Sequence, residues 1–259
     1  MAKLTKPQIK AHARAIELLK QDRLTIDERE FVLENWQEAA NHINSAAGAF
    51  FTPLGLAWDF SIDVGGLRIL DLCAGIGALS YAMFERGSFN RSRDEDPKIT
   101  CVEVNPDYVE VGRKIVPEAT WICGDIFDLP DDLGRFDWVI ANPPFGKIGG
   151  KADFDLAVVE LAERYADNAT FILPAGSVPW RFSGQRGYDP SRPSDKAVRF
   201  RDRTKIELRP GCGVDCDFYR DQWRGAAPAV EIALADYEEA RSQRPAAPAA
   251  QADLFGAAA

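Results

Sequence analysis

Long apolar runs are missing from this 259-residue sequence. No stretch comes near the roughly 20 apolar residues that cross a bilayer, and the first residues lack the apolar core of a signal peptide. We therefore expect a cytoplasmic protein with no membrane partner. Its hydrophobic share of 46% and its charged share of 27% are ordinary for a globular chain with one sizeable domain.

Metal-binding and disulfide patterns are also scarce. The five cysteines form no Cys-x-x-Cys pair, and the two histidines, His12 and His42, lie far from them in sequence. Cys212 and Cys216 have one intervening residue too many for the commonest ligand pair. The sequence therefore predicts no metal centre and no disulfide framework.

Positive charge is in short supply, since the net charge at pH 7 is −9. This argues against a protein coated with charge for nucleic-acid binding. Residues 181–209 depart from the trend, with nine Lys/Arg against four acidic residues. One basic segment on an acidic protein indicates a local contact with an anionic partner.

Strands and helices are expected to alternate along most of the chain. Helical periodicity over residues 5–21 and 26–43 predicts a helical N-terminal extension, which we place at residues 1–46. The expected strands are 67–72, 99–104, 119–123, 136–141, 168–173, 204–208 and 229–235. Helices between them predict an α/β fold over residues 47–240, with a doubly wound, mostly parallel seven-stranded sheet.

Two segments differ in composition from the rest. Residues 175–210 are rich in Gly, Arg and Pro, and we interpret them as a basic substrate loop. Residues 241–259 are rich in Ala, Pro and Gln, which predicts a flexible tail.

The first expected strand ends in a glycine-rich turn, Asp71-Leu-Cys-Ala-Gly75-Ile-Gly77. Glycine lets a ligand approach the backbone closely, because it has no Cβ. Cys73 stands where a dinucleotide fingerprint needs its first glycine, and Asp71 would repel a phosphate. The turn suits a ligand with a cationic amino group, and Glu103 after the second strand could accept both hydroxyls of a ribose.

These signals, taken in order, resemble the S-adenosylmethionine site of class I methyltransferases over roughly residues 48–175. The resemblance implies a Rossmann-like fold and S-adenosyl-L-methionine as cofactor. By the family pattern, the methionine part is surrounded by Asp71, Ala74, Gly75 and Gly77. Glu103 would hold the ribose, Asp125 would accept an adenine amino hydrogen, and Ile126 would flank the adenine ring.

The fourth strand ends in Asn142-Pro143-Pro144-Phe145. An amino group on a heteroaromatic ring is a poor nucleophile, because its lone pair is delocalised into the ring. The Asn142 side-chain oxygen and the Pro143 carbonyl could accept its hydrogens and localise that lone pair. Pro143 and Pro144 stiffen the loop, and Phe145 offers a stacking face for a flat base. The chain has no Pro-Cys pair, which argues against the covalent route of cytosine C5 methylation.

Several methyltransferase groups share this Asn-Pro-Pro-aromatic motif, so the motif alone leaves the substrate open. Adenine-N6 DNA enzymes, some RNA base enzymes and release-factor glutamine enzymes all carry it. Phe51, Thr52 and Pro53 resemble the Phe-Tyr-Thr-Pro segment of γ-type adenine DNA methyltransferases, which packs over the methionine moiety. This likeness favours DNA, although Thr52 and Pro53 also suit an ordinary helix start.

The chain is too short between its fifth strand and its closing pair of strands for a separate target-recognition domain. The basic segment is therefore the expected DNA contact, with Trp180, Phe182, Tyr188 and Phe200 as supports for bases. A solvated loop that balances an acidic body is the alternative. The expected contacts are Arg181, Arg186, Arg199, Arg201, Arg203 and Lys205.

The tail holds Gln251-Ala-Asp-Leu254-Phe255. This stretch resembles the Gln-x-x-Leu-Phe peptide by which bacterial replication and repair proteins dock on the DNA sliding clamp. The resemblance implies the clamp as a partner, which would raise the local concentration of DNA. An inert tail is the alternative.

These observations together predict an S-adenosylmethionine-dependent enzyme that methylates adenine N6 in DNA. The rival enzymes methylate an RNA base or a protein glutamine. The non-catalytic rival binds the cofactor and acts through the sliding clamp.

Overall fold

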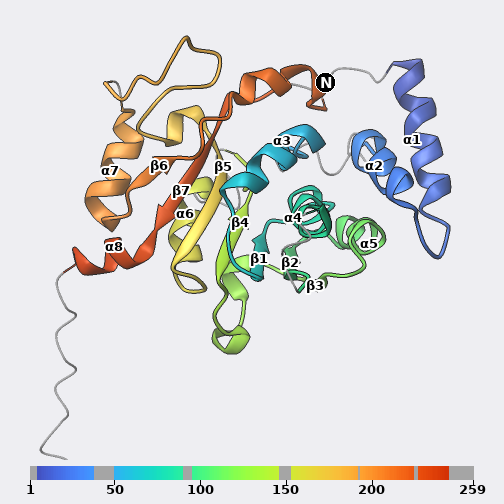
Figure 1. Ribbon diagram of the computed structural model, residues 1–259, viewed down its shortest axis with the longest axis horizontal. Coiled ribbons are helices and arrows are strands. Elements are labelled where there is room, and N and C mark those ends of the chain that lie inside the picture. The colour runs from blue at the N-terminus through green and yellow to red at the C-terminus, as the bar shows by residue number, and fades with distance from the viewer. Residues whose placement is uncertain are drawn as a thin grey trace, which may run out of the picture.

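A seven-stranded sheet forms the centre of the molecule (Figure 1). The computed structural model describes residues 5–37, 50–89, 95–145, 153–191, 193–224 and 227–244. The strands are β1 (Arg68–Leu72), β2 (Lys98–Glu103), β3 (Thr120–Cys123), β4 (Trp138–Ala141), β5 (Asn168–Pro174), β6 (Leu208–Pro210) and β7 (Val230–Asp236). Within the described residues no helix combines the length and the apolarity that a bilayer span requires.

The strand order is β3-β2-β1-β4-β5-β7-β6. Strands β1 to β5 are parallel, and β7 runs antiparallel to both β5 and β6. The predicted doubly wound, mostly parallel fold is therefore confirmed. The chain builds outward from β1 to β3 and then returns to place β4 on the other side of β1. Ligands of such sheets bind where the order reverses, beyond the carboxyl ends of the strands.

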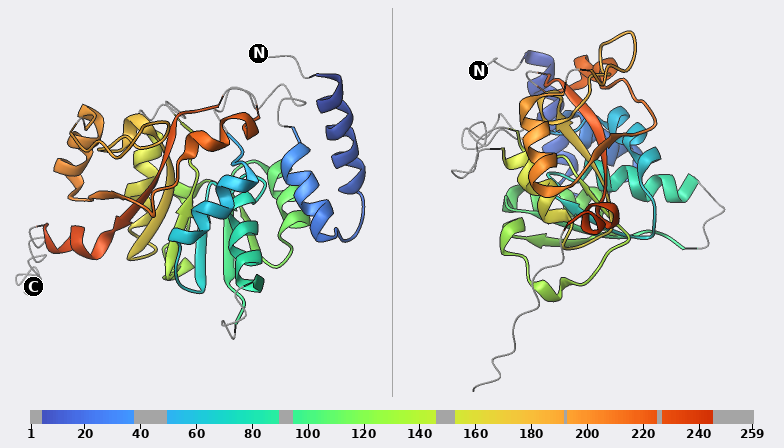
Figure 2. Two further views of the ribbon diagram at one scale, coloured as in Figure 1. Left: turned by 45° about the horizontal axis from the view of Figure 1, so that its top comes forward. Right: turned by 90° about the vertical axis from the view of Figure 1, so that its left-hand side faces the viewer.

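Helices cover both faces of this sheet (Figure 2). One face packs against α3 (Leu54–Phe60), α4 (Ala78–Phe89) and α5 (Pro106–Ile115), and the other against α6 (Phe154–Ala162) and α7 (Asp195–Thr204). Neighbouring strand residues alternate between the two faces, so Ile69 joins the first core cluster and Leu70 the second. Both faces are buried, which explains the nearly continuous apolar strands.

The N-terminal helices are α1 (Lys6–Leu18) and α2 (Ile26–Asn35), drawn in blue in Figure 1. Each begins with a capping box, Thr5 with Gln8 and Thr25 with Glu28. The two helices share the core cluster of α3, α4 and α5. An ion pair between Arg29 and Glu118, 3.1 Å long, fastens α2 to the body. The N-terminal helices are therefore part of the main core. The predicted helix 26–43 continues beyond residue 37 into positions that lie outside the described residues.

Two expectations about the C-terminal third are wrong. The predicted strand 204–208 is instead the end of α7 followed by β6, which begins at Leu208. Helix α7 lies inside the expected loop 175–210, and the Ser194 side chain caps it by accepting from Ala197 N at 3.1 Å. The start of the predicted tail at residue 241 is wrong, because α8 (Tyr237–Ser242) extends past residue 240, and residues 245–259 lie outside the described part of the chain. Arg244 also pairs with Glu163 at 2.8 Å.

Candidate active site

A buried carboxylate marks the end of β1. The Asp71 side chain is fully buried, and its Oδ2 accepts a hydrogen bond from Ser80 Oγ at 2.6 Å. Its Oδ1 has no hydrogen-bond partner. Burial raises the pKa of Asp71 to about 7, although the Ser80 hydrogen bond opposes the shift. An unpaired buried oxygen is rare in native proteins and indicates a place for a donor.

The turn after β1 has an unusual backbone. Gly75 and Gly77 have φ values of +57° and +90°, in the left-handed region that favours glycine. Cys73, between the strand and the glycines, also has a positive φ of 61°. A Cβ at Gly77 would lie 3.2 Å from the Trp121 ring, so this glycine also serves packing.

Glu103, at the end of β2, holds this turn in place. Its Oε2 accepts from Gly75 N and its Oε1 from Asn105 N, each at 2.8 Å. Burial raises the pKa of Glu103. Each carboxylate oxygen has a second lone pair, so the ribose contact stays a prediction beside this structural role.

The Asn142 side chain follows β4 and is oriented by the Phe50–Pro53 segment. Its Nδ2 donates to Phe50 O and to Thr52 Oγ1, both at 2.9 Å. A carbonyl oxygen can only accept, so the contact with Phe50 fixes which side of the amide is nitrogen. The Oδ1 is left buried without a hydrogen-bond partner.

One narrow cavity of about 30 Å³ brings together six of the predicted site residues. It is lined by Phe50, Phe51, Thr52, Asp71, Cys73, Ala74, Gly75, Ile76, Ala78, Leu79 and Asn142. Asp71 and Asn142, each with a buried oxygen that has no hydrogen-bond partner, are therefore among the residues that line the same space. The cavity is narrow because the Phe51 ring lies over Gly75, 3.5 Å from where a Cβ would stand.

The Asn-Pro-Pro-Phe loop continues away from this cavity. Pro143 is buried and Pro144 is half-buried. Phe145 stacks on Phe50, with ring centroids 5.3 Å apart and planes 25° apart, and Trp223 meets Phe50 edge-on at 6.3 Å. One face of Phe145 is therefore already in aromatic contact.

Asp125 and Ile126 lie after β3, outside that cavity lining. The Asp125 Oδ1 accepts from Phe127 N at 2.9 Å and caps the short helix η4 (Ile126–Asp128). Ile126 is buried in the second core cluster. Their contacts with an adenine ring stay predictions, and only Asp125 is exposed.

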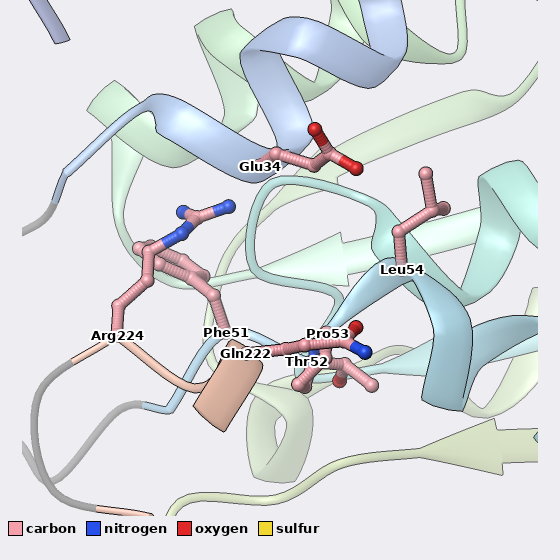
Figure 3. A pocket seen from close by; sticks show the side chains of 7 residues that line it. All are labelled: Glu34, Phe51, Thr52, Pro53, Leu54, Gln222 and Arg224. Atoms are coloured by element: carbon pink, nitrogen blue, oxygen red, sulfur yellow. The ribbon is translucent and has the colours of Figure 1, made fainter. Parts of the chain in front are cut away.

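A second pocket of about 240 Å³ shares Phe51 and Thr52 with the first (Figure 3). Its other lining residues are Glu34, Pro53, Leu54, Gln222 and Arg224. The Arg224 guanidinium lies 5.2 Å from the centre of the Phe51 ring and donates to Trp36 O. No sequence motif pointed to Arg224, because its role depends on the folding together of three distant segments.

Comparisons with known proteins bear on the fold. No family model matches the chain, and no curated protein matches it. A structure described as a class I S-adenosylmethionine-dependent methyltransferase from Listeria monocytogenes is similar, with a TM-score of 0.56 and 14% identity. The match covers 90% of this chain and 75% of that one. The chain has the class I methyltransferase fold.

Two further solved structures support this methyltransferase fold. One is described as the modification subunit of a type I restriction enzyme from Vibrio vulnificus, with a TM-score of 0.52 and 15% identity. The other is a type I restriction-modification methyltransferase subunit from Streptococcus thermophilus, with a TM-score of 0.51 and 14% identity. The matches cover 84% and 82% of this chain, but only 51% of each of those chains. This chain thus spans about half the length of those subunits.

The basic segment of this methyltransferase fold is more ordered than expected. Trp180 and Phe200 are buried in the second core cluster, so their prediction as base supports is wrong. Both rings pack in the core between the basic segment 181–209 and the sheet.

The predicted DNA-contact residues fall into two groups. Arg203 pairs with Glu160 at 2.8 Å, Arg201 with Asp202 at 3.1 Å, and Lys205 Nζ donates to Asp202 O at 2.8 Å. Arg181, Arg186 and Arg199 are exposed. All six stay predictions as DNA contacts, and the exposed three have the best access.

The predicted clamp-binding residues lie outside the part of the chain that the structure describes. Gln251, Leu254 and Phe255 lie beyond the described residues, so clamp binding stays a prediction. In the part of the chain that the structure describes, no group of three His, Cys, Asp or Glu residues could hold a metal ion.

Proposed function

We propose that this protein transfers a methyl group from S-adenosylmethionine to the N6 amino group of adenine in DNA. The observation that carries the proposal is the pair of unpaired buried oxygens, Asp71 Oδ1 and Asn142 Oδ1, in side chains that line one cavity. Asp71 Oδ1 suits the cationic amino group of the cofactor, and Asn142 Oδ1 suits the hydrogens of the amino group that reacts.

The residues present fit S-adenosylmethionine. A buried carboxylate with a free acceptor is stabilised by a cation, which the α-amino group of the methionine part offers. The glycine turn has no Cβ at Gly75 or Gly77 to keep a ligand from the backbone, and Glu103 stands one strand away for the ribose. When bound, the cofactor would supply an activated methyl carbon.

Asn142 would act on the substrate nitrogen. Its Oδ1 accepts an amino hydrogen, while Phe50 O and Thr52 Oγ1 keep its Nδ2 turned away. The Pro143 carbonyl is the second acceptor. These two acceptors favour a tetrahedral nitrogen whose lone pair is available for bonding, and they need little reorganisation because the loop is stiff. After transfer, water takes the surplus proton.

DNA is the favoured substrate for two reasons. Phe51 and Thr52 line the cavity beside Asp71 and Gly75, in keeping with the resemblance of the Phe51-Thr52-Pro53 segment to adenine DNA enzymes. Two of the similar structures are described as restriction-modification subunits, whose names point to DNA. RNA base or protein glutamine methylation is the enzymatic alternative, and a cofactor-binding protein without activity is the other.

The test is tritium transfer from methyl-labelled S-adenosylmethionine to DNA, RNA and protein in parallel reactions. We expect label in DNA alone, recovered as N6-methyladenine after digestion to nucleosides. Label in RNA or protein alone would refute the DNA assignment and leave the methyltransferase assignment standing. No label, with S-adenosylhomocysteine still bound, would favour the non-catalytic alternative.

A further inference from the structure

Phe218 is the most exposed large apolar side chain in the described part of the chain, at 79%. It lies on the short helix η7 (Cys216–Gln222). A single exposed apolar residue is ordinary on a protein surface. What sets this one apart is the rigidity of its support and its position beside the proposed active site.

The helix that presents Phe218 is fixed on both sides of it. Cys216 and Tyr219 are buried, and the Tyr219 hydroxyl donates to Asp59 of α3. The Asp215 side chain caps η7 by accepting from Asp217 N at 3.0 Å. The phenyl ring is therefore held out into solvent by an anchored backbone.

Helix η7 lies next to the proposed catalytic loop. The Tyr219 ring is packed against Gly55 of α3, just after the Phe50–Pro53 segment. Trp223, directly after η7, contacts Phe50 edge-on, and Phe50 stacks on Phe145. Figure 3 shows Gln222, the last residue of η7, beside Thr52 and Pro53. Phe218 thus lies on an anchored helix, and Trp223, which follows that helix, contacts the segment that orients Asn142.

The surface beside this helix carries charges of both signs, and Arg181 is an exposed cation outside the Asp217–Arg220 ion pair. A pocket of about 170 Å³ next to η7 is lined in part by Arg181 and Arg220. Its acidic residues are already engaged. Asp217 pairs with Arg220, and Glu231 accepts from the backbone N–H groups of residues 182 and 183, each at 2.9 Å. Asp221 is an exposed acid on the same helix and opposes an anion there.

We propose that Phe218 is a wedge that enters the DNA duplex and occupies the space left by an extruded adenine. Arg181 then contacts a phosphate of the flanking backbone. An enzyme that acts on a base inside a duplex must first take it out of the stack, and an apolar ring inserted at that step stabilises the gap. The inference rests on the proposed function, because it assigns the substrate as duplex DNA with a flipped base.

The experiment compares two forms of one substrate, a long unmethylated DNA fragment used either as duplex or after strand separation. Phe218→Ala should lower kcat/KM on the duplex by at least tenfold and change it less than twofold on single strands, where no base needs extrusion. Phe218→Trp should retain most duplex activity, because the indole can also stack. The control Ile26→Ala, at a residue 54% exposed on α2, should change neither.

The outcomes separate this inference from the proposed function. Equal losses on duplex and single strands, or no loss on either, would overturn the wedge while leaving the methyltransferase assignment intact. Absence of DNA methylation by the wild-type protein would overturn both. Melting temperature and S-adenosylhomocysteine binding should be unchanged in Phe218→Ala, since the ring is exposed, and they verify that the variant is folded.

Discussion

At the residue scale, the proposed chemistry rests on two buried oxygen atoms, Asp71 Oδ1 and Asn142 Oδ1. A buried acceptor left unsatisfied costs roughly 1–3 kcal/mol. Asp71 Oδ1 and Asn142 Oδ1 both carry this cost, and their side chains line the same cavity. Bound ligand and substrate groups would satisfy both atoms, so the cost is recovered in the complex.

Replacing Asn142 tests the substrate acceptor. Asn142→Ala should lower kcat about 10²- to 10³-fold, the usual loss when one preorganised transition-state contact is removed. Binding of S-adenosylhomocysteine, measured by calorimetry, should change only a few-fold. Asn168→Ala at the start of β5 is the matched control and should keep its activity. Full turnover in the Asn142 variant would refute its role.

Replacing Asp71 tests the charge partner of the cofactor. The pKa of about 7 means that the free protein binds a proton at Asp71 below neutral pH, and a cationic ligand must release it. Affinity for S-adenosylhomocysteine, which carries the same α-amino group, should rise with pH up to about 7 and then level off. Asp71→Asn should weaken binding and flatten this slope.

The raised pKa of Asp71 also makes the free energy of unfolding depend on pH. Because the pKa of Asp71 is raised from 3.8, folded protein holds this proton longer than unfolded protein does. The proton on Asp71 contributes to the free energy of unfolding in full below pH 4, and this contribution declines as the pH rises toward 7. Glu103, whose pKa is also raised, titrates in the same direction. The Asp71→Asn variant is therefore needed to separate the two, and an unchanged binding slope in it would contradict the assignment to Asp71.

The Phe50–Pro53 segment is the decisive structure at the element scale. It orients Asn142 from one side, and it is held by Trp223 and Arg224 from the other. Three of its residues, Phe50, Phe51 and Thr52, also line the narrow cavity.

From this geometry we expect Arg224 to act as a positioning residue. Arg224→Ala removes a charged hydrogen bond to Trp36 O and a cation–π contact with Phe51. Losses of this kind are worth about 1–3 kcal/mol. We expect faster hydrogen exchange in residues 50–56 and a fall in kcat larger than any rise in KM for DNA. Arg224→Lys should restore part of the kcat. Unchanged exchange in Arg224→Ala would show that the contact does not position the segment.

The elements also show which features a sequence can reveal. The Asn142 loop and the Asp71 turn were predictable, because each is a short contiguous motif at the end of an apolar strand. Helix α7 was missed because Arg and Asp dominate it, although Ala197, Phe200 and Thr204 form a buried stripe at helical spacing. Phe218 and Arg224 could not be found, since their importance arises from contacts across the fold.

At the scale of the whole molecule, the N-terminal helices and the Phe50–Pro53 segment share one packed cluster of aromatic rings. Trp36 meets both Phe51 and Tyr108 edge-on, with centroids 5.6 and 5.8 Å apart. Removal of residues 1–37 would uncover these rings, and lost burial is worth about 25 cal/mol per Å². We expect a lower melting temperature and loss of S-adenosylhomocysteine binding. Removal of the residues after 244 should change neither, and a fragment lacking 1–37 with the wild-type melting temperature would contradict this expectation.

Helix α8 has a practical consequence for studying the protein. It begins where Tyr237 N donates to Asp167 O, beside the first residue of β5, and the site lies beyond the other end of the sheet. A seven-residue strand separates the two edges by about 20 Å. A dye or a sensor-surface tether attached after residue 244 is therefore joined at the edge of the sheet opposite the proposed active site. DNA can then approach that site without meeting the attachment point.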